Sequence, residues 1–429
     1  RFYSSAFGDG QVSAPSKLSN DCFALPAGVH WTPVSEALRL LEQRLQCCVP
    51  VEQSAVEQSD GRILAHAVIA ARSHPPCANS AVDGYAFAGG LQAGAQSLQL
   101  RDGRSAAGEA FKGRLLPGQA LRILTGAALP GGADTVVLQE DVRIDDGRLQ
   151  VTGPLKAGAN ARAAGEDMQQ GVQIFPAGHQ LRPEDLAVIA AVGLGEVSVF
   201  KPLKVAVIST GAELRAPGQA ARVDQIFDAN RPMLCAVLRR WGMEVVDLGI
   251  VPDEAAAVRA ALDRAKDCAD VIMTSGGASA GDEDHMSAVL RASGGMALWR
   301  IAVKPGRPLA LGVWGGVPVF GLPGNPVAAF VCTLIFARPA LLQLAGAGFQ
   351  VPQALHIPAA FSKTKKAGRR EYLRARLRDG AAHVFASEGS GRVSGLSWAE
   401  GLVELPEAAA EIKPGQTVCF LPYASFGLP

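Results

Sequence analysis

The spacing of apolar residues predicts a helix as the first regular element of the chain, over residues 32–46. Apolar side chains recur there on one helical face, Thr32 can cap the start and Pro33 fits the first turn. Residues 1–29 are rich in Ser, Gly and Asp and have few periodic apolar positions. We therefore expect a flexible N-terminal arm ahead of the first folded residues.

Short alternating runs of apolar and polar residues follow, separated by Gly-rich turns. They are clearest at 121–124 and 135–139. Alternation with a period of two is typical of half-buried strands. The pattern predicts a β-rich insertion at about 75–155, within an N-terminal and linker region that spans residues 30–195.

A run without polar interruption marks the next change, at Lys204–Thr210 (KVAVIST), and such runs are typical of strands buried on both faces. The pattern then predicts a helix from about Asn230, a strand at 244–248, a helix at 254–268, a strand at 270–274 and a helix from about Asp282. This order predicts a doubly wound parallel sheet with helices on both faces over residues 203–345. Ligands of such sheets bind at the carboxyl ends of the strands.

Short strands reappear between Gly and Pro turns near the C-terminus, at 372–377, 383–386, 402–405 and 417–421. They predict a small β domain over residues 352–429. The expected fold class is therefore α/β and multidomain, with β-rich units on either side of a central α/β domain.

Composition excludes several classes of protein. Hydrophobic residues make up 48% of the 429 residues and charged residues 19%, so the chain can bury a core and is not a disordered polymer. The net charge of +1 and the aromatic content of 6% argue against nucleic acid as a partner. The longest apolar run, Val327–Ala337, is shorter than the ~18 residues of a membrane span. We expect a cytoplasmic protein with no membrane partner, whose eight cysteines are free, mostly buried thiols.

The segment 270–286 (DVIMTSGGASAGDEDHM) predicts a strand, a glycine-rich turn and the start of a helix. Its glycines, among them Gly276 and Gly277, let backbone amides approach an anion closely. The adjacent acids at 282–284 would repel a bare phosphate, a conflict that a hard cation such as Mg²⁺ between them removes. The alternative is that these acids only cap the helix.

Two proline-rich turns further along the chain are shaped for an anionic ligand. The KPGRP turn presents Lys304 and Arg307 on a stiff backbone, which suits an oxyanion or a phosphate. The LPGNP turn is fixed by Pro323 and Pro326 with Gly324 between them, so a ligand can approach its backbone closely. A solvated basic turn is the alternative for KPGRP.

Further polar residues lie near predicted strands. Glu213 and Asp253 each follow a strand of the parallel sheet, at its ligand-binding edge. Asp83 in SAVDGYA and Thr125 in TGAALPGGAD would each, alone, be an ordinary loop residue, and Asp167 adds a further acid. Together these segments predict an acid-rich pocket with two fixed cations, suited to a metal-bridged anionic ligand.

The motifs occur in a fixed order: SAVDGYA, TGAALPGGADTVV, GED, ISTGAEL, DANRPML, TSGGASAGDED, KPGRPLALG and GLPGNPVAAF. In that order the chain resembles the molybdopterin molybdenumtransferase family, which includes MoeA and the gephyrin E domain, over residues 30–425. The resemblance implies a β-rich insertion, a connecting α/β piece, a central molybdopterin-binding-like domain and a C-terminal small β-barrel. It also implies a homodimer whose active-site cleft is formed by both chains.

The reaction implied by the resemblance inserts molybdate into adenylylated molybdopterin, with Mg²⁺-dependent release of AMP, and yields molybdenum cofactor. In this reading Asp253 and Asp284 hold the magnesium ion. The other implied catalytic residues are Asp83, Thr125, Asp167 and Glu213. Of these, Asp83 and Thr125 would reach the cleft from the second chain. The implied substrate-binding residues, in which Lys304 and Arg307 hold molybdate or the pterin phosphate, are Gly276, Gly277, Ser279, Lys304, Arg307, Pro323 and Pro326.

The sequence departs from the family pattern at a few positions. Ala328 stands where Ser is common after NPV, which removes a hydroxyl donor and leaves the oxyanion contacts open. Arg307 replaces a common Lys and keeps the charge, while Val82 for Met is a packing change. None of these departures affects a carboxylate of the implied site.

Two other functions are compatible with parts of the sequence. A molybdopterin adenylyltransferase would share the central domain but would need neither the SAVDGYA half nor the C-terminal domain. A non-catalytic, gephyrin-like scaffold would have no need of the acidic residues, which are intact here. The expected partners are a second copy of the chain, a molybdopterin adenylyltransferase and acceptor molybdoenzymes.

Overall fold

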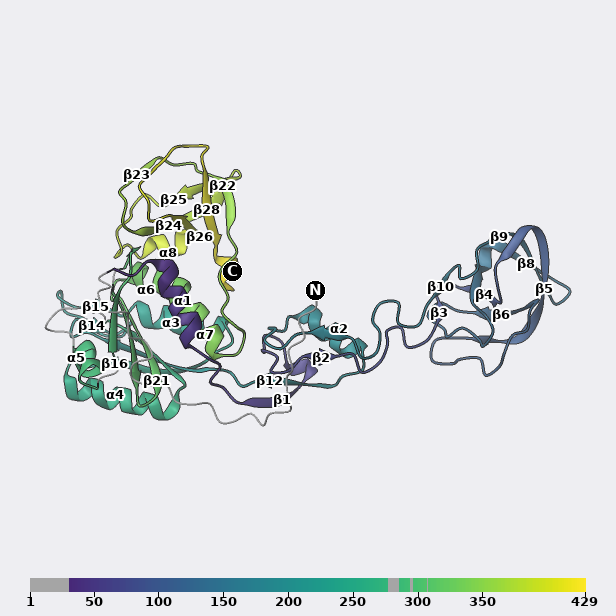
Figure 1. Ribbon diagram of the computed structural model, residues 1–429, viewed down its shortest axis with the longest axis horizontal. Helices are drawn as coiled ribbons and strands as arrows, with labels where there is room; N and C mark the ends of the chain where they lie inside the picture. The colour runs from purple at the N-terminus through teal and green to yellow at the C-terminus, as the bar shows by residue number, and fades with distance from the viewer. Residues whose placement is uncertain (1–30, 277–284, 294–295, 307) are drawn as a thin grey trace.

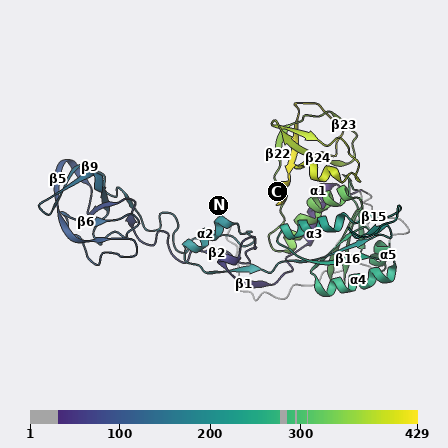
Figure 2. The same cartoon turned by 180° about the vertical axis from the view of Figure 1, so that it is seen from behind.

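The computed structural model describes residues 31–276, 285–293, 296–306 and 308–429. These residues form an elongated molecule, with an inserted β-sheet at one end and the central and C-terminal units at the other (Figure 1 and Figure 2). A small connecting unit lies between the two ends. The expected multidomain α/β fold is confirmed.

The inserted sheet has six strands in the order β7-β4-β6-β5-β9-β8. They are β4 (Gly84–Phe87), β5 (Leu91–Ser105), β6 (Gln119–Ile123), β7 (Thr135–Leu138), β8 (Val142–Asp145) and β9 (Arg148–Leu155). Two short strands, β3 (Asn79–Ser80) and β10 (Ala161–Arg162), pair with each other outside this sheet. The strands predicted from alternation at 121–124 and 135–139 are β6 and β7, whose apolar residues Leu121 and Val137 are buried.

The connecting unit is built from two short strand pairs and one helix. In it β1 (Val51–Ala55) pairs with β12 (Glu196–Phe200), and β2 (Val68–Ile69) pairs with β11 (Gln173–Phe175), both antiparallel. The helix α2 (Pro183–Ala191) starts with a proline, and its Asp185 carboxylate accepts the backbone amide of Arg182 at 3.0 Å. The chain passes through this unit on its way into the insertion and again on its way out. The connecting unit therefore joins the inserted sheet to the rest of the molecule.

The central sheet is mixed, which corrects the prediction of a wholly parallel sheet. Its order is β16-β13-β17-β21-β20-β18, in which the first four strands pair in parallel, whereas β20 runs in the opposite direction and pairs antiparallel with both β21 and β18. The bounds are β13 (Lys204–Thr210), β16 (Glu244–Val251), β17 (Val271–Ser275), β18 (Met296–Arg300), β20 (Pro308–Trp314) and β21 (Val317–Leu322). The chain reverses between β20 and β21 at Gly315 and Gly316, whose positive φ angles suit a tight hairpin turn.

Helices cover both faces of this sheet, as the uninterrupted apolar run of β13 predicted. On one face Val205 and Val207 belong to a core shared with α1 (Val34–Arg44) and α3 (Asn230–Arg240). On the other, Ala206 and Ile208 belong to a core shared with α4 (Ala255–Cys268) and α5 (His285–Ala292). Figure 1 shows α4 and α5 below the sheet and α1 and α3 above it.

A continuous helix of 19 residues, Pro326–Leu344, lies in the larger core. It consists of α6 (Pro326–Cys332), the π-helical turn η3 (Thr333–Ala337) and α7 (Arg338–Leu344). Its mean hydropathy of 1.8 and its length would let it cross a membrane, but 94% of its apolar window is buried inside the protein. That burial is typical of a core helix.

The C-terminal unit is a sheet in the order β19-β24-β26-β28-β22, with β25 paired to β24. Its strands are β19 (Val303–Lys304), β22 (Leu355–Pro358), β24 (Arg370–Arg378), β25 (Ala381–Val384), β26 (Gly401–Leu405) and β28 (Thr417–Pro422). A separate pair, β23 (Lys363–Lys365) with β27 (Ala410–Ile412), and the helix α8 (Ser394–Trp398) complete it. The amide of Ala360 donates to the carbonyl of Ala382 at 2.8 Å, which brings β22 and β25 together and closes a small barrel.

Some local expectations are wrong. Thr32 does not cap α1, which begins at Val34 without a side-chain cap, because Thr32 is extended and its amide bonds to the carbonyl of Arg300 at 3.0 Å. The strand predicted at 244–248 continues to Val251. The described cysteines are free, as expected, but among them only Cys235 and Cys332 are fully buried.

Candidate functional site

The parallel strands of the central sheet end at one edge, and the loops leaving it carry several predicted site residues. They are Glu213 after β13, Asp253 after β16, Gly276 after β17, and Pro323 and Pro326 after β21. The amide of Gly276 donates to the carbonyl of Leu322 at 3.2 Å, so the loops after β17 and β21 begin side by side. Because ligands bind at this edge of such sheets, the fold places these residues together where a ligand is expected.

Gly276 cannot be replaced by another residue without strain. Its φ angle of +86° lies in the left-handed region that favours glycine. A Cβ atom there would lie 2.5 Å from the carbonyl oxygen of Thr210, at the end of β13. The absent side chain therefore lets two strand ends approach each other, and leaves the backbone open to a ligand.

Asn230 links two of the ligand loops, a role that the sequence analysis missed. It is the first residue of α3 and is 6% exposed. Its Nδ2 donates to Ser275 Oγ at 2.8 Å and to the Gly324 carbonyl at 2.7 Å, which fixes the end of β17 against the LPGNP turn. The signal was a polar residue at the start of an apolar helix, inside the quoted DANRPML motif.

The two carboxylates at this edge differ in their surroundings. Glu213 is exposed in the turn before β14 (Leu214–Arg215), whereas Asp253 is half-buried between β16 and α4. The other predicted magnesium ligand, Asp284, lies outside the described residues, as do Gly277, Ser279 and Arg307. Among the residues that the structure describes, no three His, Cys, Asp or Glu side chains form a metal-binding group.

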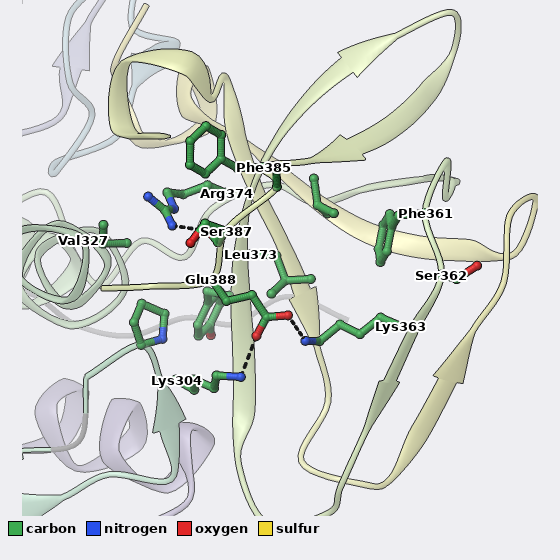
Figure 3. A pocket seen from close by; sticks show the side chains of 14 residues that line it. Lys304, Val327, Phe361, Ser362, Lys363, Leu373, Arg374, Phe385, Ser387 and Glu388 are labelled. Atoms are coloured by element: carbon green, nitrogen blue, oxygen red, sulfur yellow. Dashed lines mark hydrogen bonds and ion pairs between the residues drawn. The ribbon is translucent and has the colours of Figure 1, made fainter. Parts of the chain in front are cut away.

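Lys304 lies in a cluster of four charged residues between the central and C-terminal units, here called the lysine–glutamate cluster. Its members are Lys304, Lys363, Glu371 and Glu388. The Nζ atom of Lys304 donates to Glu388 Oε2 at 2.7 Å and lies 3.5 Å from Glu371 Oε2. Lys363 donates to the other oxygen of Glu388 (Figure 3) and lies 3.2 Å from Glu371 Oε2. The predicted cation is thus one of a pair, and both lysines face the same carboxylate.

Electrostatics within the cluster favour the charged forms of two of its members, Glu388 and Lys363. Burial alone would raise the pKa of Glu388, but the hydrogen bonds from the two lysines outweigh it and the pKa is lowered. Burial would likewise lower the pKa of Lys363, but its hydrogen bond to Glu388 and its ion pair with Glu371 raise that pKa instead. The Glu388 carboxylate and the Lys363 ammonium group therefore stabilise each other's charged forms.

The cluster borders a pocket of about 210 Å³. Its lining combines the charged side chains Lys304, Lys363 and Glu388 with apolar ones that include Phe361, Leu373 and Phe385 (Figure 3). This volume is below the about 300–1,000 Å³ that is usual for the sites of drug-sized molecules, so the pocket itself suits a smaller group. The sequence analysis identified only Lys304 among these residues.

The KPGRP turn packs directly on the LPGNP turn. A Cβ atom at Gly306 would lie 3.6 Å from Pro323 Cγ, 3.4 Å from Ala328 Cβ and 3.1 Å from Cys332 Sγ. Ala328 is buried at this contact, where the Ser of the family pattern would be packed among apolar atoms. Lys304 is therefore adjacent to the sheet edge through two stiff turns in contact.

Asp83 and Thr125 form a hydrogen-bonded pair in the inserted sheet unit. One carboxylate oxygen of Asp83 accepts both the hydroxyl and the backbone amide of Thr125, each at 2.7 Å. The hydroxyl, and then the amide, lower the pKa of Asp83. Asp83 directly precedes β4, which Figure 1 and Figure 2 place at the opposite end of the molecule from the central sheet. The family resemblance implied that both residues reach the cleft but not that they bond to each other, and a single chain does not bring them to the sheet edge.

Asp167 lies on the return path from the insertion to the connecting unit. It is exposed, next to an isolated bridge between His74 and Met168, and its amide donates to the carbonyl of His74 at 3.2 Å. No described contact joins it to the sheet edge. Its predicted place in the cleft stays a prediction.

Comparison with known proteins assigns three matching regions to this chain. The MoeA N-terminal region (domains I and II) matches residues 32–193, a probable molybdopterin-binding domain matches 206–343, and the MoeA C-terminal region (domain IV) matches 356–423. The matches follow one another in the order of the central and flanking units described above.

Relatives match over nearly the whole length. A molybdopterin molybdenumtransferase of Haemophilus influenzae is 34% identical over 393 residues, covering 90% of this chain and 96% of that protein. Molybdopterin molybdenumtransferase 2 of Mycobacterium tuberculosis is 34% identical over 397 residues, covering 89% and 97%. The solved structure of a molybdopterin biosynthesis MoeA protein from Pyrococcus horikoshii has a TM-score of 0.80 at 27% identity, covering 92% and 100%. The chain therefore belongs to the molybdopterin molybdenumtransferase (MoeA) family of enzymes.

Proposed function

We propose that this enzyme inserts molybdenum, supplied as molybdate, into adenylylated molybdopterin and releases AMP in a Mg²⁺-dependent reaction. One observation carries the proposal: the ligand loops at Gly276 and Pro323–Pro326 are in contact at the strand ends, beside the cationic turn that holds Lys304. Loops open to backbone contact suit a phosphate, and a fixed ammonium group suits an oxyanion. The family of the chain makes molybdopterin the expected organic substrate.

The residues at the edge fit a magnesium ion as far as the structure describes them. Mg²⁺ in proteins is commonly held by one or two carboxylates together with substrate phosphate oxygens. Asp253, half-buried at the end of β16, supplies one such carboxylate, and Asp284 would supply the second. When bound, the ion would neutralise the phosphoanhydride of the adenylylated substrate.

This chain's own groups hold and orient the two anionic substrates. Lys304, with Arg307, would bind the oxyanion, while the backbone around Gly276 and the LPGNP turn would receive the phosphate end of the pterin. Asn230 keeps these two loops in register through its bonds to Ser275 and Gly324. Holding both reactants in one orientation turns an encounter of two anions into a reaction within one complex.

A homodimer would complete the site. The Asp83–Thr125 pair lies far from the central sheet in its own chain, so in our proposal it serves the sheet edge of a second copy. Asp167 and Glu213 would line the same cleft. The enzyme would act in the cytoplasm, receive adenylylated molybdopterin from an adenylyltransferase and pass its product to acceptor molybdoenzymes.

The two alternative functions make different predictions in one assay. An adenylyltransferase would consume ATP with molybdopterin, and a pure scaffold would turn over neither substrate. Incubation with adenylylated molybdopterin, Mg²⁺ and molybdate should instead yield AMP and active molybdenum cofactor together. AMP release without cofactor formation, or neither, would count against the proposal.

Tungstate should compete with molybdate in that assay, because a site that recognises charge and tetrahedral shape does not separate the two oxyanions well. We expect an equimolar mixture to lower the yield of molybdenum cofactor by about half relative to molybdate alone, and a tenfold excess of tungstate to lower it about tenfold. Perchlorate, tetrahedral but singly charged, is the control and should compete weakly. An enzyme indifferent to a large excess of tungstate would contradict the proposed oxyanion site.

A further inference from the structure

We infer that Glu388 is an internal counter-anion that occupies the oxyanion position at Lys304 and Lys363 and is displaced when the oxyanion binds. The inference rests on the proposed function and adds Lys363 and Glu388 to the residues that set oxyanion affinity. The carboxylate of Glu388 accepts hydrogen bonds from both lysines, one through each of its oxygens. A dianion with several oxygens can make the same two contacts.

The two glutamates of the cluster have different roles. Glu371 is buried, with a side chain 10% exposed, and its Oε2 lies near both lysines without an aligned hydrogen bond within the described part of the chain. Glu388 has a side chain 45% exposed and receives the aligned bonds. Glu371 is therefore the permanent partner, and Glu388 is the one that can leave for solvent.

Arg374 fixes the backbone around Glu388, so only the side chain of Glu388 has to move when it is displaced. Its guanidinium donates to the carbonyls of Ser387 and Gly389, the two neighbours of Glu388, and to that of Arg392. Arg374 is 4% exposed, and the amide of Val327 in α6 also holds this loop by donating to the Ser390 carbonyl at 3.1 Å. The backbone on each side of Glu388 is thus fixed, and rotation of its exposed side chain is enough to free both lysines.

Charge balance explains why such a device is useful. With Glu388 in place, the cluster of two lysines and two glutamates is neutral, so the lysines are not left unpaired before the substrate arrives. With Glu388 turned away, the lysines outnumber Glu371 and the position becomes cationic. The exchange lowers oxyanion affinity but favours a dianion over a monoanion, because only the stronger ligand displaces the carboxylate.

The test is direct binding of tungstate to the full-length protein at low ionic strength, measured by calorimetry without pterin. Glu388→Gln removes the competing charge and keeps the shape, so we expect tungstate to bind about tenfold more tightly than to the wild type. Glu400→Gln is the matched control, because Glu400 pairs with Arg378 on the surface of the same domain. We expect no change in that variant.

A second variant keeps the test decisive if Glu388→Gln disturbs the loop, which thermal unfolding would reveal. Lys363→Met should weaken tungstate binding at least tenfold, because it removes one of the two facing cations. Equal or weaker binding by a folded Glu388→Gln, or unchanged binding by Lys363→Met, would overturn the inference. If the wild-type enzyme forms molybdenum cofactor but neither variant changes the affinity for tungstate, the inference is overturned and the proposed function is left intact. If both variants change the affinity for tungstate as expected but the wild-type enzyme releases no AMP, the proposed function is overturned and the displacement of Glu388 is left intact.

Discussion

Asp253→Asn should lower AMP release from adenylylated molybdopterin by about a hundredfold to a thousandfold and weaken the apparent affinity for Mg²⁺. Asp253 is the half-buried carboxylate at the end of β16, and asparagine keeps its shape but removes its charge. A hard cation at a reacting phosphate contributes several kcal/mol, which corresponds to this loss in rate. The measurement is AMP formed at a series of Mg²⁺ concentrations.

The control for this variant lies on α4, the helix that follows Asp253. Asp263 of α4 is a carboxylate that pairs with Lys266 and accepts a hydrogen bond from Trp314 Nε1 at 3.0 Å, away from the sheet edge. Asp263→Asn should retain AMP release and its Mg²⁺ dependence. Full activity of Asp253→Asn at low Mg²⁺ would remove Asp253 from the proposed site.

Gly276→Ala should both destabilise the central unit and disable the site. The side chain would force a left-handed backbone on alanine and place Cβ 2.5 Å from the carbonyl oxygen of Thr210. We expect the free energy of unfolding to fall by about 3 kcal/mol from strain and overpacking together. Displacement of the loop by about 1 Å is enough to lower turnover by about a hundredfold.

A second glycine separates the two causes of this effect. Gly218 also has a positive φ, of +88°, but a Cβ there would meet no atom within 4 Å. Gly218→Ala should therefore lower the free energy of unfolding by only about 1 kcal/mol. Urea unfolding of both variants checks the difference, and equal effects would show that the contact with β13 is unimportant.

Local patterns of apolar residues correctly predicted the strands and helices whose buried faces follow a regular spacing. The run Lys204–Thr210 became β13 with those same bounds, because alternate residues of it enter the two cores on either side of the sheet. The helix from Asn230 was likewise correct, and its end at Gly242, with a φ of +78°, follows the usual preference for glycine after a helix. The periodicity of apolar residues and the glycines at the ends of elements predict the bounds of such strands and helices without any information on residues distant in the sequence.

Contacts between distant segments were out of reach of the sequence. Lys304 and Glu388 are separated by 84 positions, and nothing near either residue indicates the other. The same holds for Thr32, whose capping role was lost to a backbone bridge with Ile301. The reversed direction of β20 goes with the Gly315-Gly316 hairpin that joins it to β21, which the pattern of apolar residues did not reveal.

The site shows the same division. The predicted strand at 270–274 placed Gly276 at the ligand-binding edge, whereas the LPGNP turn was expected in the site only from its shape and from the family resemblance, and the structure shows that it follows the neighbouring parallel strand β21. Motif spacing could not show that Asp83 and Thr125 share a hydrogen bond, nor that the fold carries them away from that edge. The structure was needed to assign roles to three residues of the site, Lys363, Asn230 and Glu388, because each acts through contacts with other elements of the fold.

The central claim is that one catalytic site combines the sheet edge of one chain with the Asp83 region of another. Heterodimers of one Asp83→Asn chain and one Asp253→Asn chain, isolated through two affinity tags, test it most directly. In our account each parent homodimer releases almost no AMP, whereas the heterodimer has one intact site and recovers about half of wild-type turnover. A heterodimer as inactive as its parents, despite normal folding, would show that both residues act within a single chain and would contradict the account.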